Sequence, residues 1–192
     1  GTVQATSGYV GGIVGYLTNT RVNSGLVKGN AVIKTSTGSS RCYAGGIVGY
    51  SMSSIEGCYN YASISGNSCV GGINGCVRAI DAIITNSHNF GNVTGTQKYI
   101  GGITGYSVDI ISYSNNYGLV SGYEYVGGII GSSNSTIVNC HNNGAVKGTS
   151  CTGGIAGIAE DGIVTLCINN GYIYNPGKGW NIGGIVGQSY VD

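Results

Sequence analysis

Charged side chains are scarce in this chain, and they do not gather anywhere along it. Among 192 residues there are eight Lys and Arg and seven Asp and Glu, which gives a net charge of +1. Basic runs attract nucleic acid and anionic membrane surfaces, so we expect neither as a partner. The apolar stretches are far shorter than the roughly 20 residues of a membrane-spanning helix, and we therefore predict no membrane insertion.

Proline is nearly absent, whereas glycine is abundant. Proline and tryptophan occur once each and glycine 38 times. The glycines follow no Gly-X-Y period, which excludes collagen. Hydrophobic residues make up 41% of the chain and charged residues 8%, the reverse of the balance in disordered chains. We therefore expect an ordered fold in which glycine is required at particular positions.

A Gly-Gly-Ile-x-Gly repeat fills the chain. The glycine pairs begin at Gly11, Gly45, Gly71, Gly101, Gly127, Gly153 and Gly183, at intervals of 34, 26, 30, 26, 26 and 30 residues. A period of this length indicates a solenoid or a propeller, and propeller blades run to about 40–45 residues. The sequence thus predicts an all-β fold, a parallel β-helix-like solenoid of about seven 26-residue repeats, forming a single domain over residues 1–192.

Each repeat has strict columns. The third position is always isoleucine, and the fourth varies as Val14, Val48, Asn74, Thr104, Ile130, Ala156 and Val186. Alternation of an invariant apolar position with a variable one is typical of a strand with one buried face. We expect the seven isoleucines to stack in one buried file, with the variable column in solvent and two or three short strands per turn.

An asparagine column follows in the second half of each repeat. It comprises Asn60, Asn89, Asn116, Asn142 and Asn169. Asparagine tolerates left-handed backbone, and stacked amides can hydrogen-bond from one turn to the next. We expect this column to be structural, at a bend of the coil.

The repeat resembles the GLUG-motif family, named for a Gly-Leu-hydrophobic-Gly core. Here that core is Gly46-Ile47-Val48-Gly49 and its six relatives, with isoleucine always in place of leucine and a polar residue at Asn74 and Thr104. Such repeats belong to bacterial cell-surface and adhesin-like proteins. The resemblance implies a non-enzymatic structural rod, extracellular or at the cell surface, that binds other protein chains. It implies no catalytic residue and no cofactor.

Seven cysteines are the first candidates for chemistry. Cys140 and Cys167 share a column on adjacent turns, where a separation of about 4.8 Å would allow a disulfide. Cys42 and Cys69, before successive glycine pairs, are a second candidate pair. Buried free cysteines in a small-residue column are the alternative. With no Cys-x-x-Cys pair, and with His88 and His141 two turns apart, we predict no metal site.

Tyrosine is the other candidate. Tyr16, Tyr50 and Tyr106 follow the third glycine of their repeats. Exposed tyrosines can bind surface glycans or a partner protein, so a carbohydrate- or ligand-binding solenoid is the alternative function. The structural alternative is that these rings shield the backbone or contact a neighbouring rod.

Two further features concern the surface and the ends of the chain. Asn92 and Asn134 begin Asn-x-Ser/Thr sequons, which are glycan acceptors in a eukaryotic source. The chain begins late in one repeat and stops early in another, without a polar cap. Solenoids need capping repeats, so we expect either a segment of a longer array or head-to-tail self-association into a filament.

Overall fold

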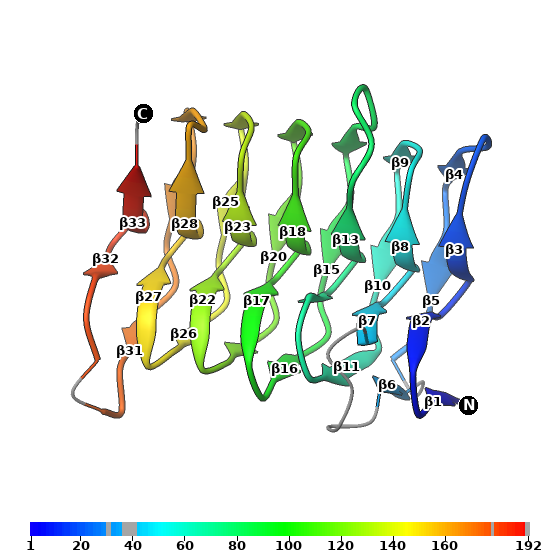
Figure 1. Ribbon diagram of the computed structural model, residues 1–192, viewed down its shortest axis with the longest axis horizontal. Helices are drawn as coiled ribbons and strands as arrows, with labels where there is room; N and C mark the ends of the chain where they lie inside the picture. Colours follow the sequence, from blue (N-terminus) through cyan, green and yellow to red (C-terminus); the bar gives the residue numbers. More distant parts are fainter. Residues whose placement is uncertain (30–31, 36–41, 178, 191–192) are drawn as a thin grey trace.

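The computed structural model describes residues 1–29, 32–35, 42–177 and 179–190, and in this part of the chain every regular element is a β-strand. The strands stack in parallel into a β-solenoid of about six turns, roughly 29 residues apart. Figure 1 shows the turns side by side along the long axis, with the N-terminus at one end and the C-terminus at the other. The predicted fold class is confirmed.

Five parallel sheets, named A to E in the order the chain visits them, run along the solenoid. Sheet A contains β1 (Thr2–Ala5), β6 (Val32–Thr35), β11 (Ser63–Gly66), β16 (Val93–Gly95), β21 (Val120–Ser121), β26 (Val146–Lys147) and β31 (Ile173–Tyr174). Sheet B contains β2 (Gly8–Gly11), β7 (Cys42–Gly45), β12 (Val70–Gly71), β17 (Lys98–Gly101), β22 (Glu124–Gly127), β27 (Ser150–Gly153) and β32 (Ile182–Gly183). Sheet C contains β3 (Val14–Leu17), β8 (Val48–Ser51), β13 (Asn74–Val77), β18 (Thr104–Ser107), β23 (Ile130–Ser133), β28 (Ala156–Glu160) and β33 (Val186–Tyr190).

The two remaining sheets have shorter strands. Sheet D contains β4 (Val22–Asn23), β9 (Ile55–Glu56), β14 (Ile84–Thr85), β19 (Ile111–Ser112), β24 (Ile137–Val138) and β29 (Val164–Thr165). Sheet E contains β5 (Leu26–Val27), β10 (Tyr59–Asn60), β15 (His88–Asn89), β20 (Asn115–Asn116), β25 (His141–Asn142) and β30 (Ile168–Asn169). A full turn thus has five strands rather than the two or three that were predicted, because strands of two residues leave no visible alternation in the sequence.

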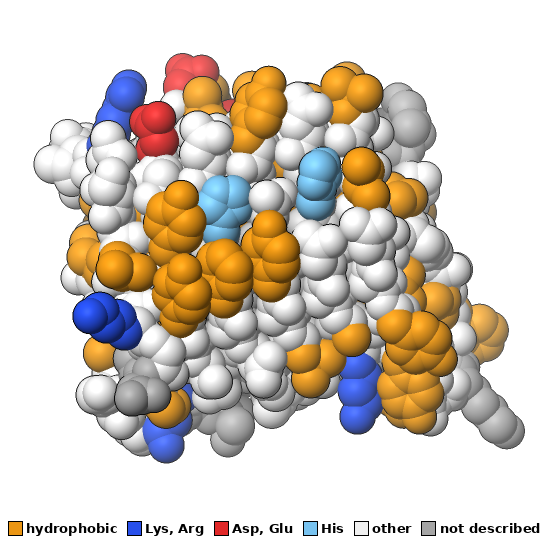
Figure 2. Space-filling view, turned by 180° about the vertical axis from the view of Figure 1, so that it is seen from behind, with side chains coloured by type: hydrophobic (Ala, Val, Ile, Leu, Met, Phe, Trp, Pro, Cys, Tyr) orange, Lys and Arg blue, Asp and Glu red, His pale blue; other side chains and the backbone are white. Residues whose placement is uncertain are grey.

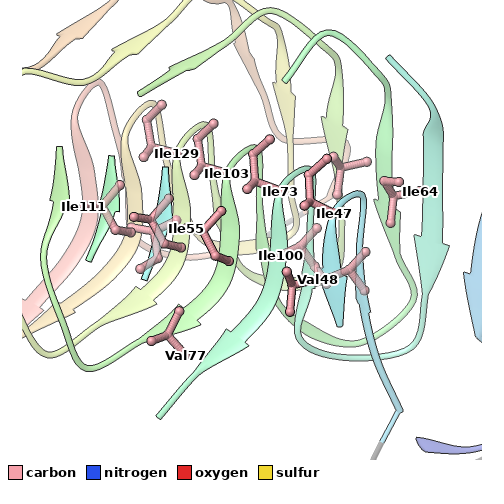
Figure 3. Packing of buried hydrophobic residues seen from close by; sticks show 14 of the residues in the cluster. Ile47, Val48, Ile55, Ile64, Ile73, Val77, Ile100, Ile103, Ile111 and Ile129 are labelled. Atoms are coloured by element: carbon pink, nitrogen blue, oxygen red, sulfur yellow. The ribbon is translucent and has the colours of Figure 1, made fainter. Parts of the chain in front are cut away.

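The isoleucine column lies at the bend between sheets B and C. Its five central members are completely buried, at Ile47, Ile73, Ile103, Ile129 and Ile155, and Figure 3 shows four of them in a row. Ile13 and Ile185 are 48% and 40% exposed, because each has a neighbouring turn on one side only. The predicted buried file is therefore confirmed for the central turns and is wrong for the two terminal ones.

The variable column is also buried, which corrects the expectation that it faces solvent. Val48, Asn74, Thr104, Ile130 and Ala156 all have zero exposure. The reason is that the Gly-Gly-Ile-x-Gly segment is enclosed on several sides. A Cβ at Gly45 would lie 1.9 Å from the Val48 carbonyl oxygen, and one at Gly49 would lie 2.6 Å from the Val10 nitrogen.

The second glycine of each of the five central pairs contacts the asparagine column of sheet E. A Cβ at Gly46 would lie 2.4 Å from Cγ of Asn60, and one at Gly102 would lie 2.3 Å from Cγ of Asn116. Glycine is required there because any side chain would overlap the amide. The bend therefore reaches across the coil to the opposite strands.

The asparagines form a continuous hydrogen-bonded ladder, as predicted. Asn60, Asn89, Asn116 and Asn142 each donate from Nδ2 to Oδ1 of the asparagine one turn on, at 2.8 Å in every case. Each Nδ2 also donates to the carbonyl two residues later. These asparagines do not have positive φ. One column of residues with positive φ lies between sheets D and E, at Ser24, Gly57, Asn86, Tyr113, Asn139 and Leu166, and a second lies along sheet B, at Cys69, Tyr99, Tyr125, Cys151 and Asn181.

Candidate functional site

Two columns of side chains flank the bend between sheets B and C, and we call them together the tyrosine–cysteine face. The sheet B column comprises Tyr9, Tyr43, Cys69, Tyr99, Tyr125, Cys151 and Asn181. The strand pairing of sheet B aligns these residues from one turn to the next. The sheet C column comprises Tyr16, Tyr50, Cys76, Tyr106, Ser132, Ile158 and Gln188. Each member of one column shares a turn with a member of the other.

The rings of the first two turns form one cluster. The centroids of Tyr9 and Tyr16 are 5.5 Å apart, those of Tyr43 and Tyr50 are 5.8 Å apart, and those of Tyr9 and Tyr50 are 4.9 Å apart. These separations lie in the range where aromatic pairs attract each other. The tyrosines therefore pack on one another across the face and along it.

The predicted tyrosines lie in one column but do not form an unbroken ladder. Tyr16 is 50% exposed, while Tyr50 and Tyr106 are partly buried. Cys76 separates Tyr50 from Tyr106. Sequence reasoning missed the partner column in sheet B. The sequence did contain a signal for it, since a tyrosine stands two residues before four of the glycine pairs.

Burial raises the pKa of four tyrosine hydroxyl groups of this face. Desolvation is the largest cause that raises the pKa of Tyr43, Tyr50 and Tyr106. It also raises the pKa of Tyr125 to about 12, with the neighbouring Glu124 as the next cause. These four tyrosines thus offer neutral hydroxyl groups at any physiological pH.

The third turn carries two cysteines where its neighbours carry tyrosines. Cys69 and Cys76 face each other across the bend, and each thiol is near enough to shift the pKa of the other. Cys69 is 6% exposed and Cys76 is completely buried. The guanidinium of Arg78 lies 5.0 Å from the ring centroid of Tyr106, and Cys76 nearby raises the pKa of Arg78. The nearby Cys69, with Arg78, lowers the pKa of Cys76, whereas Cys76 and burial raise the pKa of Cys69.

All seven cysteines are free thiols. Cys140 and Cys167 are adjacent in register, as predicted, and their side chains hydrogen-bond to each other. Cys42 and Cys69 do not share a column, which corrects that pairing. Val70 is in register with Ala44, so Cys69 matches Tyr43, whereas Cys42 pairs with Gly8 and donates from its thiol to the Thr6 carbonyl.

A second aromatic group lies on the opposite side of the coil, next to sheet E. Tyr61, Phe90 and Tyr117 are stacked face to face with centroids 4.6 and 4.7 Å apart and planes within 6°. Tyr59 and His88 are 5.2 Å apart on the same side. Figure 2 shows hydrophobic side chains gathered beside one of the two histidines. Sequence reasoning did not single out this group.

The histidines and carboxylates do not converge. Asn115 stands between His88 and His141 in the register of sheet E, so the histidines are two turns apart, as predicted. Within the described ranges, no group of three or more His, Cys, Asp or Glu side chains could hold a metal ion. Asp109 accepts backbone hydrogen bonds from Ala82 at 2.6 Å and from Ile110 at 2.7 Å, which is a structural role.

The sequon residues Asn92 and Asn134 are both exposed. The part of the chain that the structure describes contains no helix that could span a membrane.

Comparison with family models, with curated proteins and with solved structures finds no match for this chain. The GLUG resemblance therefore stays a prediction.

Proposed function

We propose that the chain is a non-enzymatic structural rod of an adhesin-like protein, extracellular or at a cell surface. One observation carries this proposal. Side-chain ladders run through the interior from turn to turn, so that the coil is filled rather than hollowed around a ligand. The asparagine ladder alone links five successive turns through four amide hydrogen bonds of 2.8 Å.

Such an interior suits a spacer. Stacked repeats gain stability from contacts between neighbouring turns, so length is set by the number of turns. The resemblance to GLUG-motif repeats points to the same role at a bacterial surface. The scarcity of charge fits a surface that meets other protein chains rather than nucleic acid.

Surface display is tested by immunolabelling. Antibodies raised against the folded 192-residue rod are applied to intact and to permeabilised cells of the source organism. We expect equal labelling of both samples, and removal of the signal by brief protease treatment of intact cells. Labelling that requires permeabilisation would overturn the extracellular part of the proposal.

A glycan-binding face is the second candidate, and the exposure of Tyr16 favours it. Sugar rings stack on the open faces of aromatic rings. In both aromatic groups most of those faces already lie against another ring, as for Tyr61, Phe90 and Tyr117. The structural role is therefore the better supported. A glycan array screened with the rod and with Tyr16→Ala separates the two, since a glycan-binding face requires signals that the variant loses.

Head-to-tail contact between rods belongs to the same proposal. Ile13 and Ile185 are exposed on the first and last turns, where a second copy stacked in register would bury them. That stacking would set Asn169 against Val27, because Val27 occupies the asparagine column in the first turn. The amide ladder would be interrupted, so we expect weak association. Sedimentation velocity at increasing concentration tests this, and a strict monomer at high concentration would contradict it.

A further inference from the structure

The third turn of the tyrosine–cysteine face carries a pair of thiols that the structural role does not use. Cys69 and Cys76 replace the facing tyrosines of the neighbouring turns. The corresponding rings are 5.8 Å apart in the turn before, between Tyr43 and Tyr50, and 5.8 Å apart in the turn after, between Tyr99 and Tyr106. The two positions therefore face each other throughout this part of the rod. With the smaller cysteine at both positions, the two thiols face each other, and each is near enough to shift the pKa of the other.

An open hollow of about 370 Å³ reaches Cys69, the first thiol of this pair, from outside. Cys69 lines it, together with the cations Arg78 and Lys98 and the rings of Tyr43 and Tyr99. Two of the eight basic residues of the chain thus converge beside one thiol. Arg78 is also near enough to Cys76 to lower the pKa of that thiol, so both thiols lie close to the same cation. The hollow is suited to a small anionic molecule.

A buried amide next to the pair supports the presence of a site. Asn74 stands two residues before Cys76 in β13, on the same face of the strand. Both of its amide atoms are buried without a hydrogen-bond partner among the described residues. Unpaired buried polar atoms are rare and call for an explanation. The corresponding residue of the next turn, Thr104, does donate a hydrogen bond, to the Tyr106 carbonyl.

We propose that Cys69 and Cys76 form a dithiol site that reacts with a small anionic disulfide and closes to an internal disulfide across the bend. Cys69 is the sulfur that the reagent meets, because it lines the hollow and Cys76 is fully buried. Cys76 acts on it from behind, and Arg78 lies beside it in the wall of the hollow. The chain then holds a covalent link between sheets B and C in its third turn.

The exchange takes place in two steps, starting with Cys76 as thiolate. Cys69 attacks one sulfur of the reagent RSSR, passes its proton to Cys76, and forms a mixed disulfide while RS⁻ leaves. Cys76 then passes that proton to the released RS⁻, attacks the sulfur of Cys69, and expels the second RS⁻. One dithiol has been oxidised to a disulfide and one RSSR has been reduced to RSH and RS⁻.

Peptide mapping after exposure to glutathione disulfide tests the site. Cleavage after Tyr61 and Arg78 releases residues 62–78, whose only cysteines are Cys69 and Cys76. We expect this peptide to become lighter by two hydrogen atoms and to resist alkylation. The Cys76→Ser variant should instead stop with one glutathione on Cys69, and serine is tolerated in that column at Ser132. Cys151 is the matched control, because Ile158 faces it, so it should form no internal bridge.

The charge preference supplies a second readout. Glutathione disulfide should oxidise the pair about tenfold faster than the cationic disulfide cystamine at low salt, and added salt should reduce this ratio. The exposed Arg78→Gln should reduce it too, while Lys147→Gln, on sheet A, should not. A peptide 62–78 that stays fully alkylated in folded protein would overturn the proposal. So would equal rates for the two reagents, or a bridge from either cysteine to a different one.

Discussion

Removal of Asn116 from the middle of the asparagine ladder should destabilise the rod severely. Asn116 is completely buried. It donates to the Gly118 carbonyl at 2.9 Å and to Asn142 Oδ1 at 2.8 Å, and it accepts from Asn89 Nδ2 at 2.8 Å. The Asn116→Ala variant therefore leaves three buried polar groups without these partners. A buried group that loses its partner costs about 1–3 kcal/mol.

The three losses add to about 3–6 kcal/mol, since Asn89 keeps its second hydrogen bond, to the Gly91 carbonyl. That is a large part of the total stability of a domain, which is about 5–15 kcal/mol. Urea unfolding followed by circular dichroism measures the change, and we expect a midpoint lower by about 1–2 M. The central position matters, because a weakened turn there divides the stack into two shorter pieces.

The matched control is Asn170→Ala. Asn170 donates to Asn143 Oδ1 at 3.0 Å, an amide-to-amide bond between adjacent turns like those of the ladder, but on the exposed side of the coil. We expect this variant to lose less than about 0.5 kcal/mol, because water replaces an exposed partner. If the two variants unfolded at the same urea concentration, burial of the ladder would not be what makes it stabilising, and the reasoning would be refuted.

Four other predictions concern the fold, the thiols and the surface of the rod. Ile103→Asp should unfold or split the rod, because it buries an unpaired charge, and the melting temperature measures this. Gly102→Ala should fail to fold, because its Cβ would lie 2.1 Å from a backbone oxygen of the next turn. The alkylation rate of Cys167 should rise with pH around a midpoint near 7, since the hydrogen bond from Cys140 lowers its pKa to about 7, and Cys140→Ala should move the midpoint upward. In a eukaryotic secretory host, mass spectrometry should find a glycan on the exposed Asn134.

Each of these has a control or a contrary outcome. Ile13→Asp changes the same column where it is half exposed, so it should cost much less than the central substitution. Gly177→Ala should be neutral, because the nearest atom to its Cβ is 3.4 Å away. An alkylation midpoint unchanged by loss of Cys140 would show that the thiol pair does not set the pKa of Cys167. A bare Asn134 beside a glycosylated Asn92 would contradict the last prediction.

Much of this fold could be predicted from the spacing of the repeats in the sequence. The interval between glycine pairs indicated a solenoid, and columns of identical residues indicated which side chains stack. The asparagine ladder is the clearest success, because five asparagines at one position on successive turns have amides close enough to bond. Cys140 and Cys167 were placed on adjacent turns for the same reason, since register in a parallel stack follows from alignment of the repeats.

The candidate site was only half readable. Tyr16, Tyr50 and Tyr106 were identified, yet their partners in sheet B were not, because sequence spacing does not show that a strand before the bend faces a strand after it. The pairing of Cys42 with Cys69 failed by a single residue. A shift of one position moves a side chain to the other face of a strand, and Cys42 lies inside the coil whereas Cys69 lines the hollow.

The sequence by itself determined the repeat length, the parallel stacking and the membership of each column, because these depend on alternation and on identity from turn to turn. The tertiary structure alone decided what the variable column faces. The Gly-Gly-Ile-x-Gly segment was expected to form a strand with one buried face, with Val48 and its relatives in solvent, but the backbone bends across the coil to Asn60 and its ladder. Backbone contacts at the glycines set the angle of this bend. Because glycine has no side chain, the sequence shows no polar or apolar pattern there that would indicate which way the chain turns.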